Sequence, residues 1–93
     1  MTWVVVPGAL RQFTGGASSM QVTLGDGATL GDLLDVLALA QPALARRVRD
    51  EQGQVRRFVN IYVDGADVRQ AGGLSASVPA DAEVLVLPSV AGG

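Results

Sequence analysis

The sequence predicts an α+β domain in which one main helix packs across one face of a mixed sheet of four or five strands. The predicted elements follow the order strand, strand, helix, strand, short strand, strand. Only one long segment carries an amphipathic apolar stripe, and one helix on one sheet is the economical way to bury it. The 93 residues, 48% of them hydrophobic, suffice for a single core. We therefore expect one domain over residues 1–88, followed by a flexible tail over residues 89–93.

The N-terminal part predicts two strands joined by a connection. Residues 2–6 are β-branched and aromatic and are followed by Pro7-Gly8, which is typical of a strand and its end. Residues 8–18 predict a loop or wide hairpin connection, because they are rich in glycine and polar residues. Apolar and polar residues alternate over residues 20–24, which predicts the second strand. A turn is expected over residues 25–27.

The helix has a clear predicted start and end. Thr29 is a good N-cap, and Asp32 stands three residues later in a capping-box position. The helix is expected to run to about Ala40, because Pro42 interrupts the pattern. A further helical turn is indicated by two apolar residues spaced four apart after this proline. The apolar stripe of the main helix consists of Leu30, Leu33, Leu34 and Leu37.

The remaining strands follow a polar loop over residues 50–54. Residues 58–63 predict a strong strand, and Asp64-Gly65 is a turn signal that allows a short hairpin into residues 67–68. Residues 83–87 predict the final strand, which ends at Pro88. Two strands, a helix and further strands, with the chain leaving from a central strand, describe the β-grasp, the fold of ubiquitin.

Composition excludes several classes of function. The chain contains no Cys and therefore no disulfide, thiol nucleophile or thiolate metal site. It contains no His, the usual general base near neutral pH and the commonest metal ligand. These absences argue against a self-sufficient enzyme and leave catalysis by carboxylates alone as the open alternative. A net charge of −2 argues against general nucleic-acid binding. No apolar run approaches the ~20 residues of a membrane span, and the N-terminus lacks a basic leader, so we expect a cytoplasmic protein.

The sequence ends in Gly92-Gly93, and this end suggests a chemical role for the terminal carboxyl group. Two residues without side chains at an extended end would enter a narrow enzyme pocket that larger residues would block. Val90 and Ala91 are small and apolar, which suits a tail that is gripped along its length. The alternative is a frayed end or a cloning scar, because chain ends are often disordered and tolerant of change.

Several segments resemble the bacterial ubiquitin-like sulfur carriers, and the resemblance spans nearly the whole chain. This family includes the small subunit of molybdopterin synthase, the thiamine-pathway carrier and the cysteine-biosynthesis carriers of the CysO type, to which the internal segments are most similar. The diglycine alone is weak evidence, but its register with the other segments makes the resemblance specific. The segments are Leu10-Arg11, Thr14-Gly15-Gly16, Arg57-Phe58-Val59-Asn60-Ile61-Tyr62-Val63, Asp67-Val68-Arg69, Gly72-Gly73-Leu74 and Leu87-Pro88-Ser89-Val90-Ala91-Gly92-Gly93.

The resemblance implies that this chain is a co-substrate of other enzymes and binds no cofactor itself. An E1-like enzyme would use ATP and magnesium to adenylate the Gly93 carboxylate, and sulfide or an enzyme-bound persulfide would then replace AMP to leave a thiocarboxylate. In cysteine biosynthesis, a pyridoxal-phosphate cysteine synthase joins the thiocarboxylate to an activated serine, and a zinc metalloprotease releases cysteine. Related carriers supply sulfur to molybdopterin, thiamine or secondary metabolites such as thiosugars. Recognition of the tail would fall on Ser89, Val90, Ala91 and Gly92.

Strand periodicity predicts a second site, an open apolar patch on the sheet. Both faces of the predicted strands carry large apolar groups, yet one good helix covers only one face. Exposed apolar patches mark partner surfaces. The alternatives are that the face assignment is reversed or that loops cover the patch. The predicted patch consists of Trp3, Val5, Phe58, Tyr62, Leu85 and Leu87.

Two groups of charged residues have plain structural interpretations. The arginines after the helix are typical of a solvated helix end, favoured by the helix dipole, and the sharper alternative is electrostatic docking to an acidic partner. The aspartates are interpreted as caps, helix surface and turns rather than as catalytic or metal-binding groups. These residues are Arg46, Arg47, Arg49, Arg56 and Arg57, and Asp32, Asp35, Asp64 and Asp67.

Two rival functions remain open at this stage. A ubiquitin-like protein modifier would attach Gly93 to a target lysine after the same adenylation step. The chain contains no Lys of its own, which weakens a lysine-linked polymer of itself but not single attachment to other proteins. A plain β-grasp adaptor would bind through its sheet and carry an inert tail, and deletion of Gly92-Gly93 would then leave its function intact.

Overall fold

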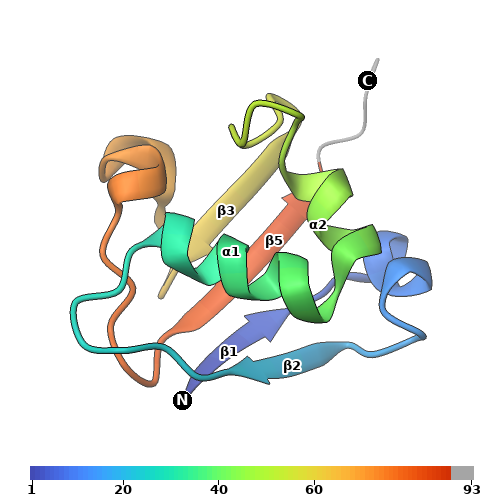
Figure 1. The fold of residues 1–93 in the computed structure, drawn as a ribbon, viewed down its shortest axis with the longest axis horizontal. Helices are drawn as coiled ribbons and strands as arrows, with labels where there is room; N and C mark the ends of the chain where they lie inside the picture. Colours follow the sequence, from blue (N-terminus) through green and yellow to red (C-terminus); the bar gives the residue numbers. More distant parts are fainter. Residues whose placement is uncertain (89–93) are drawn as a thin grey trace.

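The structure is a computed structural model that describes residues 1–88. Five strands form one mixed sheet in the order β2-β1-β5-β3-β4, and the helices α1 and α2 lie across one face (Figure 1). β1 pairs parallel with β5 and antiparallel with β2, while β3 pairs antiparallel with both β5 and β4. The predicted β-grasp is therefore confirmed. The bounds are β1 Thr2–Val5, β2 Ser19–Val22, α1 Leu30–Ala40, α2 Pro42–Val48, β3 Val59–Val63, β4 Ala66–Asp67 and β5 Glu83–Pro88.

The core lies between the sheet and the two helices. Alternate residues of β1, β3 and β5 point toward the helices and are fully buried, for example Val4, Ile61 and Val84. The four leucines of the α1 stripe are buried against them, as the helical spacing predicted. Leu44 and Val48 of α2 complete the same cluster. Because one face of the sheet takes all of these helical residues, the other face has no helix of the described chain across it (Figure 1).

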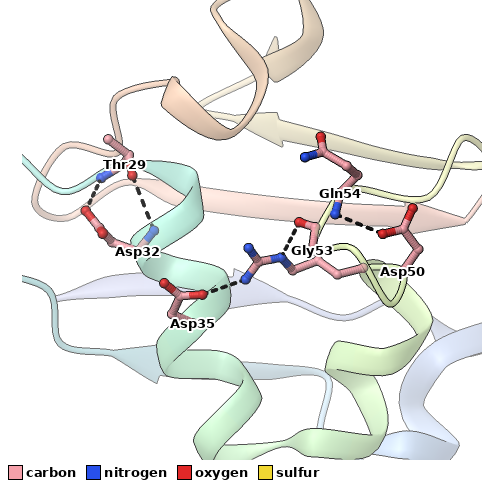
Figure 2. A network of polar contacts seen from close by, with 7 residues as sticks. Thr29, Asp32, Asp35, Asp50, Gly53 and Gln54 are labelled. Atoms are coloured by element: carbon pink, nitrogen blue, oxygen red, sulfur yellow. Dashed lines mark hydrogen bonds and ion pairs between the residues drawn. The ribbon is translucent and has the colours of Figure 1, made fainter.

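The start of α1 is fixed by the predicted capping box. The backbone N–H of Asp32 donates to Thr29 Oγ1 at 3.3 Å, and the Thr29 N–H donates to Asp32 Oδ2 at 2.9 Å (Figure 2). Two otherwise unpaired donors of the first turn are thereby satisfied. Pro42 then begins α2 at a helix position that tolerates proline, so the predicted further turn is a separate helix of seven residues. No helix in residues 1–88 is both long enough and apolar enough to cross a bilayer.

Several details depart from the sequence expectation, and the bounds of β1, β2 and β4 each differ by one or two residues from those expected. The expected loop over residues 8–18 contains a 3-10 helix, η1 (Gly8–Phe13), because Leu10 is buried in the core and anchors it. β3 begins at Val59 rather than at Phe58, and β5 continues through Pro88, which pairs with Val59. Phe58 therefore lies in a turn. Two further 3-10 helices, η2 (Val68–Gln70) and η3 (Gly73–Ser75), follow β4.

Arg69, in η2, holds the entry to β3 through backbone carbonyl groups. Its Nη2 donates to the carbonyl oxygens of Val59 at 2.6 Å, Arg57 at 3.2 Å and Arg56 at 3.4 Å. Its Nη1 donates to the side-chain oxygen of Asn60. One guanidinium therefore fixes the segment that carries Arg56 and Phe58 against the sheet.

Replacing Arg69 with alanine is expected to lower the free energy of unfolding by about 1–2 kcal/mol, since several carbonyl oxygens lose a charged donor. Arg69→Lys should recover only part of this loss, because an ammonium group lacks the planar fork. Urea unfolding followed by circular dichroism measures the difference. Arg57→Ala is the matched control and should change stability by less than about 0.5 kcal/mol. Equal stability of the Arg69→Ala and Arg57→Ala proteins would contradict this role.

Candidate functional site

The tail begins at the centre of the sheet. β5 lies between β1 and β3 and is held by both, so the chain leaves a rigid strand after Pro88. This placement agrees with the expectation that the tail follows a central strand. The predicted tail residues lie outside the described residues, so their recognition and the role of the terminal carboxyl group stay predictions. They are Ser89, Val90, Ala91, Gly92 and Gly93.

Five of the six residues of the predicted patch lie on the sheet face opposite α1. We call this surface the open sheet face. Val5 of β1 pairs with Leu85 of β5, and Leu85 also pairs with Tyr62 of β3, so their side chains form a row across three strands. None of the five is buried, and Trp3 is 44% exposed. The open sheet face consists of Trp3, Val5, Tyr62, Leu85 and Leu87.

Polar residues flank this apolar row on the neighbouring strands. Val5 pairs with Ser19 of β2 on one side, and Tyr62 pairs with Asp67 of β4 on the other. An apolar centre with a polar rim is the usual composition of a protein–protein interface. The geometry therefore suits docking of another protein on the face whose central strand leads into the tail.

Phe58 is set apart from the open sheet face. It lies in the turn before β3, in which the N–H of Val59 donates to the carbonyl oxygen of Arg56 at 3.0 Å. It is 47% exposed and lines a groove instead. The sequence placed Phe58 and Tyr62 on one face by continuing the strand alternation one residue too far.

Phe58 lines a groove at the C-terminal end of β5. It has a volume of about 480 Å³ and lies between η1, α2, the segment before β3 and the end of β5. We call it the arginine groove, because three arginines line it together with aromatic and other apolar residues. The residues that define it here are Phe13, Arg46, Arg47, Arg56, Phe58 and Pro88.

Contacts within the chain position two of these arginines. The Arg47 guanidinium carbon lies 4.6 Å from the centre of the Phe13 ring, in a cation–π contact. Arg56 Nε donates to the carbonyl oxygen of Arg46 at 2.9 Å, which ties the segment before β3 to α2. The groove arginines make no ion pair with any carboxylate in residues 1–88.

Arg49, from the same predicted cluster, has a structural role. Its Nη1 pairs with Asp35 of α1 at 2.7 Å, and its Nε donates to the Gly53 carbonyl oxygen at 2.7 Å (Figure 2). Arg49 thus links the two helices and the turn after α2. In that turn, Asp50 accepts hydrogen bonds from the N–H groups of Gln52 and Gln54. The predicted cluster therefore divides into Arg49, which supports the fold, three arginines that line the groove, and Arg57, which is exposed and does not line it.

The remaining aspartates have structural roles of the kind expected. Asp64 accepts from the N–H of Glu83 at 2.9 Å and Asp67 from the N–H of Arg69 at 2.9 Å. The Met1 amino group, through a hydrogen bond and its charge, holds the pKa of Asp81 below its ordinary value. Across residues 1–88 there is no group of three or more carboxylates that would hold a metal ion.

The groove is the feature that sequence reasoning missed. Its residues come from four separate segments, and the sequence grouped Arg46, Arg47 and Arg56 in one cluster without indicating that they share a hollow with Phe13, Phe58 and Pro88. The contribution of Phe13 depends on η1, which the glycine-rich sequence of residues 8–18 did not predict.

Comparison with known proteins identifies a family. Residues 4–93 match the ThiS family. The sulfur carrier protein CysO of Mycobacterium tuberculosis (strain ATCC 25618 / H37Rv) is 39% identical over 92 residues, which cover 97% of this chain and 96% of that protein. Small archaeal modifier protein 1 of Haloferax volcanii is 33% identical over 78 residues, covering 84% of this chain and 85% of that protein.

Solved structures of similar proteins have the same fold as this chain. The crystal structure of Mycobacterium tuberculosis CysO has a TM-score of 0.84 at 36% identity and covers 97% of this chain and 100% of that chain. A chain of the crystal structure of the Amycolatopsis orientalis BexX/CysO complex has a TM-score of 0.84 at 37% identity, with 100% of both chains covered. The similarity thus extends over the sheet, both helices and the end of β5.

Proposed function

The chain belongs to the ThiS family and is a sulfur carrier protein rather than a catalyst, and from this premise we propose that its Gly93 carboxyl group carries the sulfur. The observation that supports this proposal most strongly is that the family match extends through residue 93, with glycine at the last two positions. Pro88, the residue before this segment, lies at the end of the central strand, where it pairs with Val59 and lines the groove.

The proposed chemistry begins with activation from outside the chain. A carboxylate is an anion at neutral pH and a poor electrophile. We infer that an E1-like enzyme uses ATP and magnesium to convert Gly93 into an acyl adenylate with release of pyrophosphate. Sulfide, or an enzyme-bound persulfide, then attacks the carbonyl carbon and AMP leaves, so one oxygen of the carboxylate is replaced by sulfur. Gly92 and Gly93 present no Cβ that would obstruct the narrow pocket that such a reaction requires.

Cysteine biosynthesis is the pathway that we propose for the sulfur. Identity of 39% over nearly the full chain to a CysO protein supports this choice over molybdopterin, thiamine or secondary-metabolite synthesis. The acceptor would be a pyridoxal-phosphate cysteine synthase that joins the thiocarboxylate to an activated serine. A zinc metalloprotease would then release cysteine and regenerate Gly93.

The open sheet face is the surface that we propose for docking these enzymes. It borders the strand that leads into the tail, and a partner held there would have Gly93 within reach. Five extended residues span at most about 17 Å. The complex of CysO with BexX, in which a chain similar to this one is bound to another protein, supports a carrier that works within such assemblies.

Protein modification is a second candidate function. Similarity to small archaeal modifier protein 1, at 33% identity, favours it. It shares the adenylation of Gly93 with the carrier and differs in the acceptor, which would be an amine of a target protein instead of a sulfur-accepting enzyme.

Transfer of sulfur to an activated serine distinguishes cysteine biosynthesis from the other pathways that would accept sulfur from Gly93. The thiocarboxylate form of the protein is incubated with O-acetylserine and the cysteine synthase of the same organism, and intact mass is measured. We expect a carrier that bears one cysteine residue at Gly93. A thiocarboxylate that the cysteine synthase leaves unchanged, but that another sulfur-inserting synthase of the organism consumes, would reassign the pathway while leaving the carrier function in place.

A further inference from the structure

The arginine groove lies at the root of the tail but on a different surface from the open sheet face. Pro88, the last described residue of β5, is part of its wall, together with Phe58 and Phe13. The residues of the open sheet face do not line it. An enzyme that holds the segment after Pro88 would therefore lie directly against the groove.

Three arginines line the groove, and two carboxylate residues, Asp50 and Glu51, line neighbouring hollows with Arg46 and with Arg56. Arg46, Arg47 and Arg56 line one hollow of about 480 Å³ without a carboxylate partner in residues 1–88. One carboxylate oxygen of Asp50, in the neighbouring turn, accepts hydrogen bonds from the backbone N–H groups of Gln52 and Gln54. Three like charges around one hollow create a positive potential, which attracts an anionic group.

The charge distribution along β5 makes the groove distinct from the rest of the molecule. The start of this strand carries Glu83, with Asp64 beside it, and nearby Asp81 pairs with the Met1 amino group. Its end lies against the groove arginines. Although the net charge of the chain is −2, acidic residues lie near the start of β5 and arginines lie near its end, from which the chain continues into the tail. Such an arrangement orients an approaching acidic partner toward the tail.

The floor of the groove indicates the kind of ligand. Phe13 and Phe58 provide aromatic surface, and Phe13 already supports the Arg47 guanidinium. Arginine and aromatic residues are the types that are enriched in the energetically important parts of protein interfaces. A small inorganic anion would use the guanidinium groups but not the apolar floor. A peptide segment with carboxylates beside an apolar side chain would use both.

We propose that the arginine groove docks an acidic segment, with one apolar anchor residue, of the enzyme that activates Gly93. This inference rests on the proposed function, because it names the chemistry of the partner at the same tail. The activating enzyme is chosen over the acceptor because adenylation precedes every later use of the carrier. The carboxylates of the segment pair with Arg46, Arg47 and Arg56, and the apolar anchor packs on Phe13 and Phe58.

Charge reversal tests the groove in the intact protein. ATP–pyrophosphate exchange by the adenylating enzyme of the same organism is measured at increasing carrier concentrations. We expect Arg46→Glu and Arg47→Glu each to raise the half-saturating carrier concentration by about tenfold, which corresponds to ~1.4 kcal/mol of binding. The rate at saturating carrier should stay unchanged, because the tail is intact. Added salt should weaken binding of the native protein, and it should reduce the difference in half-saturating concentration between the native and the charge-reversed proteins.

Arg57→Glu is the matched control. It changes the charge by the same amount in an exposed residue that does not line the groove. We expect it to change the half-saturating carrier concentration by less than threefold. Thermal unfolding of each variant checks that the fold is kept, and Arg46→Gln provides a milder change that should show an intermediate effect.

The outcomes separate this inference from the proposed function. If the native protein supports no exchange, the proposed function itself fails. If the native protein supports exchange but the groove variants behave like Arg57→Glu, the groove inference is overturned and the carrier function stands. If the groove variants lose only the later transfer of sulfur to the acceptor, the assignment to the activating enzyme is overturned.

Discussion

Replacing Gly93 with valine is expected to lower the rate of ATP–pyrophosphate exchange at saturating carrier by at least about 100-fold. The branched side chain would displace the carboxylate from the α-phosphorus of ATP, and displacements of about 1 Å at a reacting centre have effects of this size. Exchange measured with the adenylating enzyme of the same organism reports on this step alone. Thermal unfolding should be unchanged, because the hydrophobic core is formed by residues between Val4 and Val86.

Gly25→Val is the matched control for this prediction. A Cβ added at Gly25 meets no heavy atom within 4 Å, and its backbone is not left-handed. It should support exchange at the native rate. Full activity of the Gly93→Val protein, or of a protein that lacks Gly92-Gly93, would contradict the assignment and would favour an adaptor that binds through its sheet.

Replacing Leu85 with alanine is expected to weaken binding to the activating enzyme by about 30-fold, or ~2 kcal/mol. Leu85 lies at the centre of the open sheet face, where it pairs with Val5 on one side and Tyr62 on the other. Residues at the centre of an apolar patch contribute most to an interface because they are fully removed from water in the complex. The half-saturating carrier concentration in the exchange assay measures the change.

Leu39→Ala is the control for Leu85→Ala, since it removes the same atoms from a different surface. Leu39 is 88% exposed on α1 and belongs to neither proposed partner surface. Its replacement should change binding by less than about 0.5 kcal/mol. Equal binding of the Leu85→Ala and native proteins, with both folded, would contradict the proposed role of the open sheet face.

The sequence predicted those features that depend on local periodicity. The spacing of four leucines and the pairing of Thr29 with Asp32 defined α1 and its start, and the structure has both. Strand alternation placed Val5 and Leu85 on the same side of the sheet, and their pairing confirms this. Alternation also identified a face that a single helix would leave open.

Features that depend on contacts between distant segments were not predictable in the same way. The arginine groove needs η1, α2 and the turn before β3 to meet at one end of β5. The turn itself is held by Arg69, more than ten residues further along the chain. Phe58 lies in a turn instead of the predicted strand, because the N–H of Val59 bonds back to the carbonyl oxygen of Arg56. These outcomes follow from tertiary packing, which a periodic pattern does not encode.

The intact mass of the protein purified from native cells tests the central claim most directly. A fraction of the molecules should have one oxygen replaced by one sulfur, and fragmentation should place that sulfur on Gly93. The fraction should disappear in cells that lack the adenylating enzyme. A protein whose C-terminal carboxylate is always unmodified under sulfur demand, or one found only in isopeptide conjugates through Gly93, would contradict the sulfur-carrier account.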